Sequence, residues 1–316
     1  MPTIRSVRPT DLVSLISFLR DGSHREVTAP MWPRLSGGTD GRAVRRLLPR
    51  VLIGSGRSQV WVSTGRGGLR GVAVAQPRAA KLAWDVEDLF VSEDDHSVGI
   101  DLLEHLSGEA ARRGARRVFL TTPIESDLAR MASRAGFANY TSEVLYSLQL
   151  AAPVSGSGAS PARPRLRQDT QALFQLYNAA VPCRVRSAEA MTIDEWSSLD
   201  RGSRLWAPSL GGITQHLVWE GQAGLIAWLR LTFGAHSQLL ELLSHPAHGA
   251  EVDAILQYSL SQASHKVPIY APAREYQADI SGALERRGFS RMADYLIFAK
   301  ELATRVHGRV LVPARA

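Results

Sequence analysis

The stretch RAGFANYTSEVLYSLQL at residues 134–150 recurs later in the chain as RRGFSRMADYLIFAKEL at residues 286–302. In each copy a short helical pattern ends at a Gly-Phe pair, and a strand-like run of apolar residues follows. The glycines of the two pairs, Gly136 and Gly288, lie 152 positions apart. A glycine after the last turn of a helix predicts a left-handed helix end, so both stretches indicate a helix followed by a closing strand.

The beginnings of the two copies also correspond. Residues 7–19 and residues 166–177 each place an Arg and then an Asp ahead of apolar residues at helical spacing. Self-similarity that is maintained over 152 to 158 positions, from the first strand to the last, indicates a repeated structural unit. The sequence therefore predicts two copies of one domain.

The segment AAPVSGSGASPARP at residues 151–164 separates the copies. It consists mainly of Ala, Pro, Ser and Gly without apolar periodicity, which is typical of a linker. We therefore predict an N-terminal domain at 1–150 and a C-terminal domain at 165–302, each large enough for its own core. Residues 303–316 are predicted to be a tail.

Both copies show the same order of elements, which alternating and helical hydrophobic patterns define. In the first copy these are a hairpin, a strand, a helix, a strand, a short helix and a strand, at residues 59–77, 84–92, 99–114, 115–123, 126–137 and 141–150. In the second copy the corresponding segments lie at residues 216–232, 237–246, 251–264, 268–272, 279–289 and 290–302. This order predicts an α/β protein of two tandem domains, each a mixed, mostly antiparallel sheet with helices on both faces.

Composition places the chain among globular proteins, since 45% of its 316 residues are hydrophobic and 21% are charged. Apolar stretches such as residues 225–233 are too short to span a bilayer, and the N-terminus lacks the apolar core of a leader. We therefore expect a cytoplasmic protein without membrane contact. The lone Cys183 suits a reducing compartment, and it is more typical of a packed small residue than of a nucleophile.

A net charge of +7 and a pI near 10 are compatible with an anionic partner, either nucleic acid or a phosphorylated small molecule. Arginines concentrate at residues 42–57 and at 109–117, but the second run has the spacing of a solvated helix face. No helix-turn-helix, zinc-finger or aromatic-rich RNA-binding signature accompanies the charge. Nucleic-acid binding is therefore the minor interpretation.

The order of strand, short loop, long helix, Gly-Ala-Arg-Arg-Val-Phe-Leu, short helix and Arg-x-Gly-Phe resembles the GNAT superfamily of acyl-CoA-dependent N-acyltransferases. The resemblance covers nearly the whole chain, once per copy. It implies that strand 84–92 and the helix after it diverge from the next strand, and that acetyl-CoA or a longer acyl-CoA lies in the opening as co-substrate. It also implies that backbone N–H groups at the start of the helix hold the pyrophosphate.

The cofactor loop of that family reads Arg/Gln-x-x-Gly-x-Gly/Ala, and here the aligned positions are Asp94-x-x-Ser97-x-Gly99. The aligned positions of the second copy are Ala247-x-x-Ala250-x-Val252. The resemblance implies cofactor contacts from the strand end and the helix start, at Phe90, Val91, Ser97, Val98, Gly99 and Ile100. Two acidic residues and the lost glycines predict weak cofactor binding, which is stronger in the first copy because it keeps a glycine at the helix start.

A carboxylate on the fourth strand commonly serves as the base in that family, and Asp88 and Glu241 occupy the matching positions. An acidic residue in an apolar strand is equally compatible with a solvated outer face. The tyrosine that protonates the leaving thiolate in many members is replaced by Ala132 and Leu284, and Ser126 or Tyr270 is the alternative proton donor. His236, His245 and His248 lack metal-ligand spacing, so no metal site is predicted.

Two functions from different classes remain open. One is an acyl-CoA-dependent N-acyltransferase, with acetyl-CoA as co-substrate, that acts on a small-molecule amine. The other is a catalytically inactive GNAT-like protein that binds a ligand or partner through its basic surface. The sequence does not indicate the acyl acceptor, the acyl chain length or the oligomeric state.

Overall fold

The structure is a computed structural model that describes residues 3–20, 24–26, 58–65, 67–78, 82–92, 95–149, 162–189, 192–202, 213–264 and 266–303. Of the predicted linker, residues 151–161 lie outside this description, and Ala162–Pro164 form strand β8, which pairs with the second half. All but the first residue of the predicted tail, and the arginine run at 42–57, also lie outside it. None of the described helices is long and apolar enough to cross a membrane.

The first half contains the predicted elements, with boundaries that shift by a few residues. Its elements are β1 (Thr3–Ser6), α1 (Leu12–Arg20), β2 (His24–Glu26), β3 (Gln59–Gly65), β4 (Gly68–Pro77), β5 (Ala83–Ser92), α4 (His96–Arg112), β6 (Arg117–Pro123), α5 (Leu128–Arg134) and β7 (Ala138–Leu148). The alternation of apolar residues in β3 and β4 places one side of the hairpin against α4 and the other against α1.

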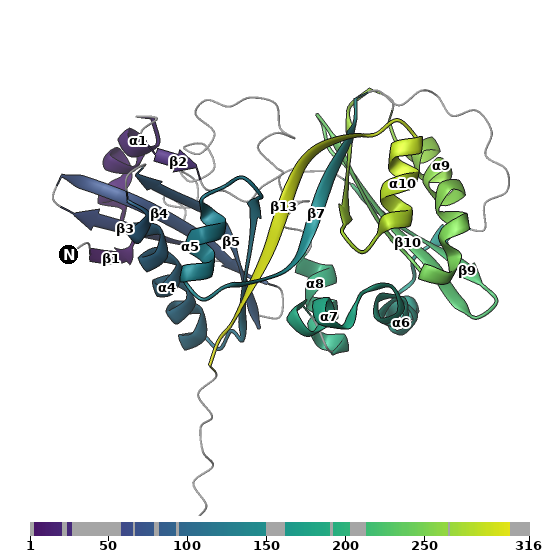
Figure 1. The fold of residues 1–316 in the computed structure, drawn as a ribbon, viewed down its shortest axis with the longest axis horizontal. Helices are drawn as coiled ribbons and strands as arrows, with labels where there is room; N and C mark the ends of the chain where they lie inside the picture. The colour runs from purple at the N-terminus through teal and green to yellow at the C-terminus, as the bar shows by residue number, and fades with distance from the viewer. Residues whose placement is uncertain are drawn as a thin grey trace, which may run out of the picture.

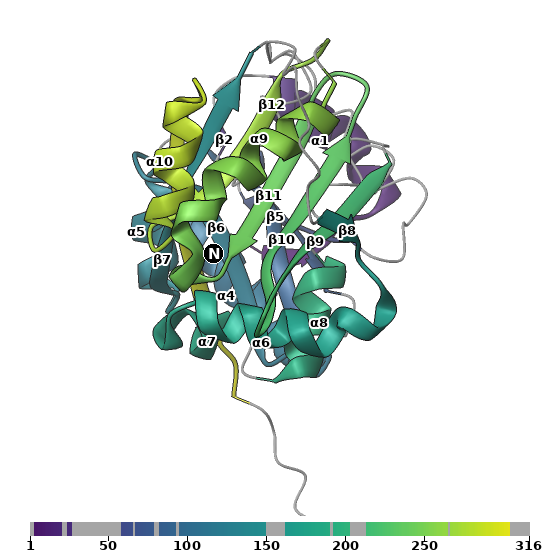
Figure 2. The same cartoon turned by 90° about the vertical axis from the view of Figure 1, so that its right-hand side faces the viewer.

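The second half repeats this order. After β8 come α6 (Thr170–Ala180), α7 (Cys183–Glu189), α8 (Ile193–Gly202), β9 (Thr214–Gly221), β10 (Gly224–Phe233), β11 (Gln238–Ser244), the 3₁₀ helix η4 (Pro246–Glu251), α9 (Val252–Gln262), β12 (Ile269–Arg274), α10 (Ala278–Arg286) and β13 (Ser290–Glu301). Figure 2 shows α9 and α10 lying in front of the strands of this half, with α6, α7 and α8 gathered below.

The Gly-Phe pairs end α5 and α10 in the same way. Gly136 and Gly288 have φ angles of 81° and 83°, in the left-handed region that residues with a side chain rarely adopt. The amide of the following Phe137 donates to the carbonyl of Ala132 at 2.9 Å, and Phe289 donates to Leu284 at 3.0 Å. This hydrogen bond turns the chain from the helix into the closing strand, which confirms the predicted helix ends.

All strands within the described residues join one 13-stranded sheet, in the order β1-β3-β4-β5-β6-β13-β7-β12-β11-β10-β9-β8, with β2 paired to β5. Pairing is antiparallel except between β5 and β6 and between β11 and β12, which are parallel. Helices cover both faces of each half, because α4 and α9 pack on one face while α1 and α6 belong to separate clusters on the other. The predicted α/β fold with mixed sheets is confirmed, and the two sheets are continuous.

The closing strands of the two halves are exchanged. β13 pairs with β6 of the first half, from Tyr295↔Pro123 to Glu301↔Arg117, and β7 pairs with β12 of the second half. β7 and β13 also pair with each other, and Figure 1 shows them side by side across the middle of the molecule. Each half therefore completes its sheet with a strand that the other half supplies. We propose that residues 151–164 divide the sequence into its two repeats. In the structure, the pairing of β7 with β13 connects the two sides of this division.

The exchange predicts that a substitution in β13 destabilises the first half. Phe298 is 3% exposed and belongs to the core cluster of Trp61, Trp84 and Leu103, although it lies more than 190 residues after them. We expect Phe298→Ala to lower the free energy of unfolding by about 3 to 5 kcal/mol. Amide hydrogen exchange should accelerate in α4 and β6.

Phe289→Ala is the matched control, because Phe289 is equally buried and lies in the core cluster of the second half. This variant should accelerate exchange first in α9 and α10. An effect of Phe298→Ala that is confined to residues 162–303 would contradict the strand exchange.

Candidate functional site

The two parallel strand pairs separate after a short common segment. Ala83–Asp85 of β5 pair with Arg117–Phe119 of β6, while β5 continues to Ser92. In the second half only Gln238 and Leu239 of β11 pair with β12. The strands of each half therefore diverge toward their carboxyl ends, which is the divergence that the resemblance implies.

A β-bulge marks β5 at the predicted catalytic position. Val86 pairs with Ala75 of β4, but the next pair is Asp88 with Val74, so Glu87 is an extra residue in β5. A bulge of this kind bends a strand and redirects its side chains. Asp88 is 2% exposed and shares the α1 face of the sheet with Val74, whereas Glu87 is half-buried and accepts a hydrogen bond from Ser58 Oγ at 3.3 Å.

Glu241, the corresponding carboxylate of the second half, forms an ion pair. It lies directly opposite Arg230 on β10, in a register that runs unbroken from Ala227↔Ser244 to Phe233↔Gln238. Arg230 Nε and Nη2 donate to the two carboxylate oxygens of Glu241. The side chains are 7% and 17% exposed, so a largely buried cation holds the carboxylate. This pairing opposes a role of Glu241 as a base, and the prediction for Glu241 has no further support in the geometry.

The amino end of α4 carries its own anion. Asp95 is the N-cap residue, and its Oδ1 accepts hydrogen bonds from Ser97 Oγ at 2.5 Å and from the amide of Val98 at 3.4 Å. Its Oδ2 lies 2.6 Å from Arg70 Nη2. The partial positive charge at a helix start attracts an anion, and here the carboxylate of Asp95 satisfies it. A phosphate group has to displace Asp95 to reach these donors. Asp94 lies outside the described residues.

The other predicted cofactor residues of the first half lie around the same strand and helix. Phe90 and Val91 of β5 and Val98 of α4 have buried side chains, so they offer a ligand only backbone atoms. Ser97 is exposed and Ile100 is partly buried. Glu241 lies in the other half and is not brought together with them.

Gly99 has a packing role. A Cβ atom there would lie 2.5 Å from Met131 Sδ of α5 and 3.3 Å from Val91 Cγ1 of β5. The glycine therefore allows α4 to approach α5 and β5 closely. This contact explains the glycine without a bound phosphate.

Strand β2 occupies the edge of β5 that β6 leaves open. His24, Arg25 and Glu26 pair with Ser92, Val91 and Phe90 in antiparallel register. β4 pairs with Val91 and Phe90 on the opposite edge, so both edges of β5 are used at its carboxyl end. The sequence predicts no strand at 24–26, because three residues without alternation carry no strand signal.

The second half closes its opening with a side chain. Gln277 Nε2 donates to the carbonyl of Leu242 on β11 at 3.1 Å, and Gln277 Oε1 accepts from the amide of Arg274 on β12 at 2.9 Å. A carboxamide has one donor group and one acceptor, like a peptide unit, so Gln277 bridges the diverging strands. The loop before α9 is capped as well, since His245 Nδ1 accepts from the amide of Ala247 at 3.2 Å.

A buried polar cluster lies beside this opening, and sequence reasoning missed it. Arg274 Nε is 2.7 Å from Glu143 Oε2 of β7, and Arg274 Nη2 is 3.4 Å from Glu189 of α7. Tyr140 donates to Glu189 Oε1 at 2.8 Å. Burial raises the pKa of Glu143, which Arg274 opposes, and burial also raises the pKa of Tyr140 well above its ordinary value. These partners are far apart in sequence, so no local pattern indicates them.

Ser126 and Tyr270 are the predicted substitutes for the missing tyrosine. Their contacts and burial suit structural roles. Ser126 Oγ accepts a hydrogen bond at 3.2 Å from the amide of Leu128, the first residue of α5. Tyr270 is 5% exposed, and burial raises its pKa. Neither is brought close to Asp88 by a contact among the described residues.

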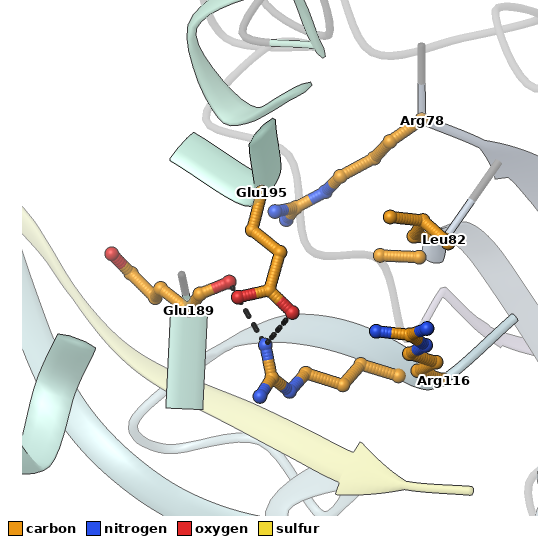
Figure 3. A pocket seen from close by; sticks show the side chains of 7 residues that line it. Arg78, Leu82, Arg116, Glu189 and Glu195 are labelled. Atoms are coloured by element: carbon orange, nitrogen blue, oxygen red, sulfur yellow. Dashed lines mark hydrogen bonds and ion pairs between the residues drawn. The ribbon is translucent and has the colours of Figure 1, made fainter. Parts of the chain in front are cut away.

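A small polar cavity lies where α7 and α8 meet the first half (Figure 3). Its lining residues are Arg78, Leu82, Ala83, Arg116, Arg117, Glu189 and Glu195. Arg117 Nη1 lies 3.4 Å from Glu195 Oε1, and Arg78 makes two hydrogen bonds to Asp85, at 2.6 and 2.8 Å. A volume of about 10 Å³ holds one water molecule. The cavity lies between the two halves, because both contribute lining residues, and it has no room for a substrate.

The self-capped helix predicts that a change at Asp95 improves anion binding. Serine also caps helices but carries no charge, so Asp95→Ser should lower stability by less than about 1 kcal/mol. Affinity for inorganic pyrophosphate, measured by calorimetry at low salt, should rise about fivefold because the competing carboxylate is gone.

Asp101→Ser removes one charge from an exposed position of the same helix and should change pyrophosphate binding little. Equal binding by both variants would mean that Asp95 does not compete with an anion.

The buried pair of Arg230 and Glu241 predicts a stability effect. Glu241→Gln leaves Arg230 without its carboxylate, and the free energy of unfolding should fall by about 3 kcal/mol. The double variant Arg230→Met, Glu241→Leu should recover most of this loss in denaturant titration. In the exposed pair of Arg163 and Glu220, Glu220→Gln should change the free energy of unfolding little. A similar small loss for Glu241→Gln would contradict a structural role for the pair.

Comparison with solved structures identifies the fold. A GCN5-related N-acetyltransferase from Sphaerobacter thermophilus aligns over 95% of this chain and 95% of its own, at 15% identity and a TM-score of 0.56. A tandem GNAT protein from the clavulanic acid biosynthesis pathway, solved without AcCoA, aligns over 95% and 98% at 12% identity and a TM-score of 0.55. A GCN5-related N-acetyltransferase from Anabaena variabilis aligns over 95% and 72% at 10% identity and a TM-score of 0.51.

No protein-family model matches the sequence, and no curated protein matches it significantly. At 10 to 15% identity the likeness to solved structures shows the fold. The protein has the tandem GNAT fold, as the repeated sequence pattern predicts.

Proposed function

We propose, from the premise of a tandem GNAT fold, that the protein is an acyl-CoA-dependent N-acyltransferase that acts on a small-molecule amine. Acetyl-CoA is the proposed co-substrate, and the opening between β5 and β6 is the proposed active site. The observation that carries the proposal is the β-bulge at Glu87, which places Asp88 where β5 has left β6. β-Bulges are over-represented next to active sites, where they redirect a side chain.

In the proposed reaction Asp88 accepts a proton from the ammonium group of the acceptor. The neutral amine attacks the thioester carbonyl carbon and a C–N bond forms. The attacking nitrogen then loses its second proton to solvent, and the C–S bond breaks to release the thiolate of CoA. The thiolate takes its proton from solvent in this proposal, because buried Ala132 stands where many relatives have a tyrosine. Glu87, adjacent to Asp88 and half-buried, adds a second negative charge that favours a cationic amine as substrate.

Acetyl-CoA fits this site only after two of the protein's own contacts open. The helix start of α4 is capped by Asp95, and the carboxyl end of β5 is paired with β2. Once Asp95 moves away, Arg70 stands beside the exposed helix start with 43% of its side chain exposed and provides a cation for a pyrophosphate. The need to open these contacts supports the prediction of weak cofactor binding.

The alternative is a catalytically inactive protein with the same fold that binds a ligand or partner. The second half favours this alternative, because Gln277 bridges its strands and Arg230 holds Glu241. The two functions differ in one measurement: only the acyltransferase releases CoA from acetyl-CoA in the presence of an amine. A cytoplasmic location belongs to both proposals.

Calorimetry and a thiol-release assay with a panel of small amines test the proposal. We expect acetyl-CoA to bind with a dissociation constant of about several hundred micromolar at low salt, because the lost loop contacts forfeit roughly 2 to 3 kcal/mol. Asp88→Asn should reduce turnover about a hundredfold or more and leave acetyl-CoA affinity nearly unchanged.

Glu87→Gln is the matched control, since it removes a neighbouring charge on the same bulge and should reduce turnover far less. A dissociation constant of a few micromolar would refute the prediction of weak binding. Absence of both binding and CoA release with every amine would support the inactive alternative.

A further inference from the structure

We propose that β2 is a strap that closes the first-half opening and has to leave β5 before an acyl-CoA enters. The inference rests on the proposed function, because it concerns access to the proposed active site. The observation behind it is the backbone register of β2 on β5.

The backbone groups of β5 explain why this position controls access. Successive residues of a strand direct their N–H and C=O groups to opposite edges, and β4 takes one edge of Phe90 and Val91. The other edge is free of β6, whose pairing with β5 ends at Asp85. An edge with unpaired backbone groups binds extended chains, and β2 is the chain that occupies it here.

An acyl-CoA carries its thioester at the end of an extended arm with two amide groups. To bring that thioester to Asp88 along β5, the arm has to take the hydrogen-bonding edge of Phe90–Ser92. Because β2 pairs with these same residues, strap and arm exclude each other. The measured affinity for acyl-CoA is then the intrinsic affinity multiplied by the fraction of molecules in which β2 is released.

The second half supports the interpretation by contrast. Its opening is spanned by the carboxamide of Gln277, the N-cap residue directly before α10. Within β11, the Leu242 carbonyl is the group that this bridge uses. A single side chain closes one opening, whereas a three-residue strand closes the other. A strand can leave as a unit, so among the described residues the displaceable closure of this kind belongs to the first half.

Arg25→Pro in the full-length chain tests the strap. Proline removes the amide at the centre of β2 and fixes a backbone angle that suits a ladder poorly. Arg25→Ala is the matched control, because it removes the same side chain and keeps the backbone able to pair. Two quantities are measured for the wild type and both variants: amide exchange at residues 90–92 by NMR, and acetyl-CoA affinity by calorimetry.

We expect Arg25→Pro to accelerate exchange of the Phe90–Ser92 amides that face away from β4. We also expect it to tighten acetyl-CoA binding about tenfold, while Arg25→Ala changes neither quantity. Faster exchange with unchanged affinity would overturn the strap and leave the proposed function intact. Unprotected amides in the wild type would overturn it as well. If no variant binds acetyl-CoA although exchange accelerates, the proposed function fails, and the strap has no ligand to exclude.

Discussion

The pairing of β7 with β13 at the centre of the sheet is the contact on which the rest of the structure depends. β6 and β12 would each end a half-sheet with an exposed row of backbone donors and acceptors. β13 pairs with the free edge of β6, and β7 pairs with the free edge of β12. The two closing strands then pair with each other. The halves are thus covalently and topologically interlocked, and their orientation is fixed by continuous backbone hydrogen bonding.

This interlock brings functional groups of one half to the other. Glu143 and Tyr140 lie on β7 of the first half, yet they pair with Arg274 and Glu189 of the second. Against this common frame the two openings have diverged. β5 contains a bulge and a removable closure, whereas the corresponding strand β11 runs in regular register and its carboxylate is held by Arg230. The repeat preserves the fold, and the chemistry differs between its copies.

Local patterns explain why much of the fold could be predicted. The helix predicted at 99–114 is α4 at His96–Arg112, and both Gly-Phe pairs end helices because only glycine adopts the required left-handed angle. The strand exchange could not be predicted, because β7 and β13 have the same hydrophobic pattern. By that pattern either strand suits the edge of β6 or of β12. The Arg230–Glu241 pair was missed for a similar reason, because facing residues on adjacent strands depend on register.

The sequence around Asp95 contains a local signal that allows two interpretations. The negative charge of Asp95 predicts an obstacle to a phosphate, but an Asp before an apolar helical run is also an N-cap signal. Both interpretations describe the same physics, since the helix start binds either its own carboxylate or a ligand's anion. For β2, no such signal exists in three residues.

The exchange of closing strands also orders the events of folding in time. The partner of β6 lies at residues 290–301, so the first half is synthesised long before the strand that completes its sheet. Until that strand has left the ribosome, the far edge of β6 lacks the partner that it has in the folded protein, and its short pairing with β5 is the native pairing that can form. Contacts between such distant residues form slowly, and open strand edges in waiting intermediates promote aggregation. The sheet around the opening between β5 and β6 is therefore completed only after the second half has been synthesised.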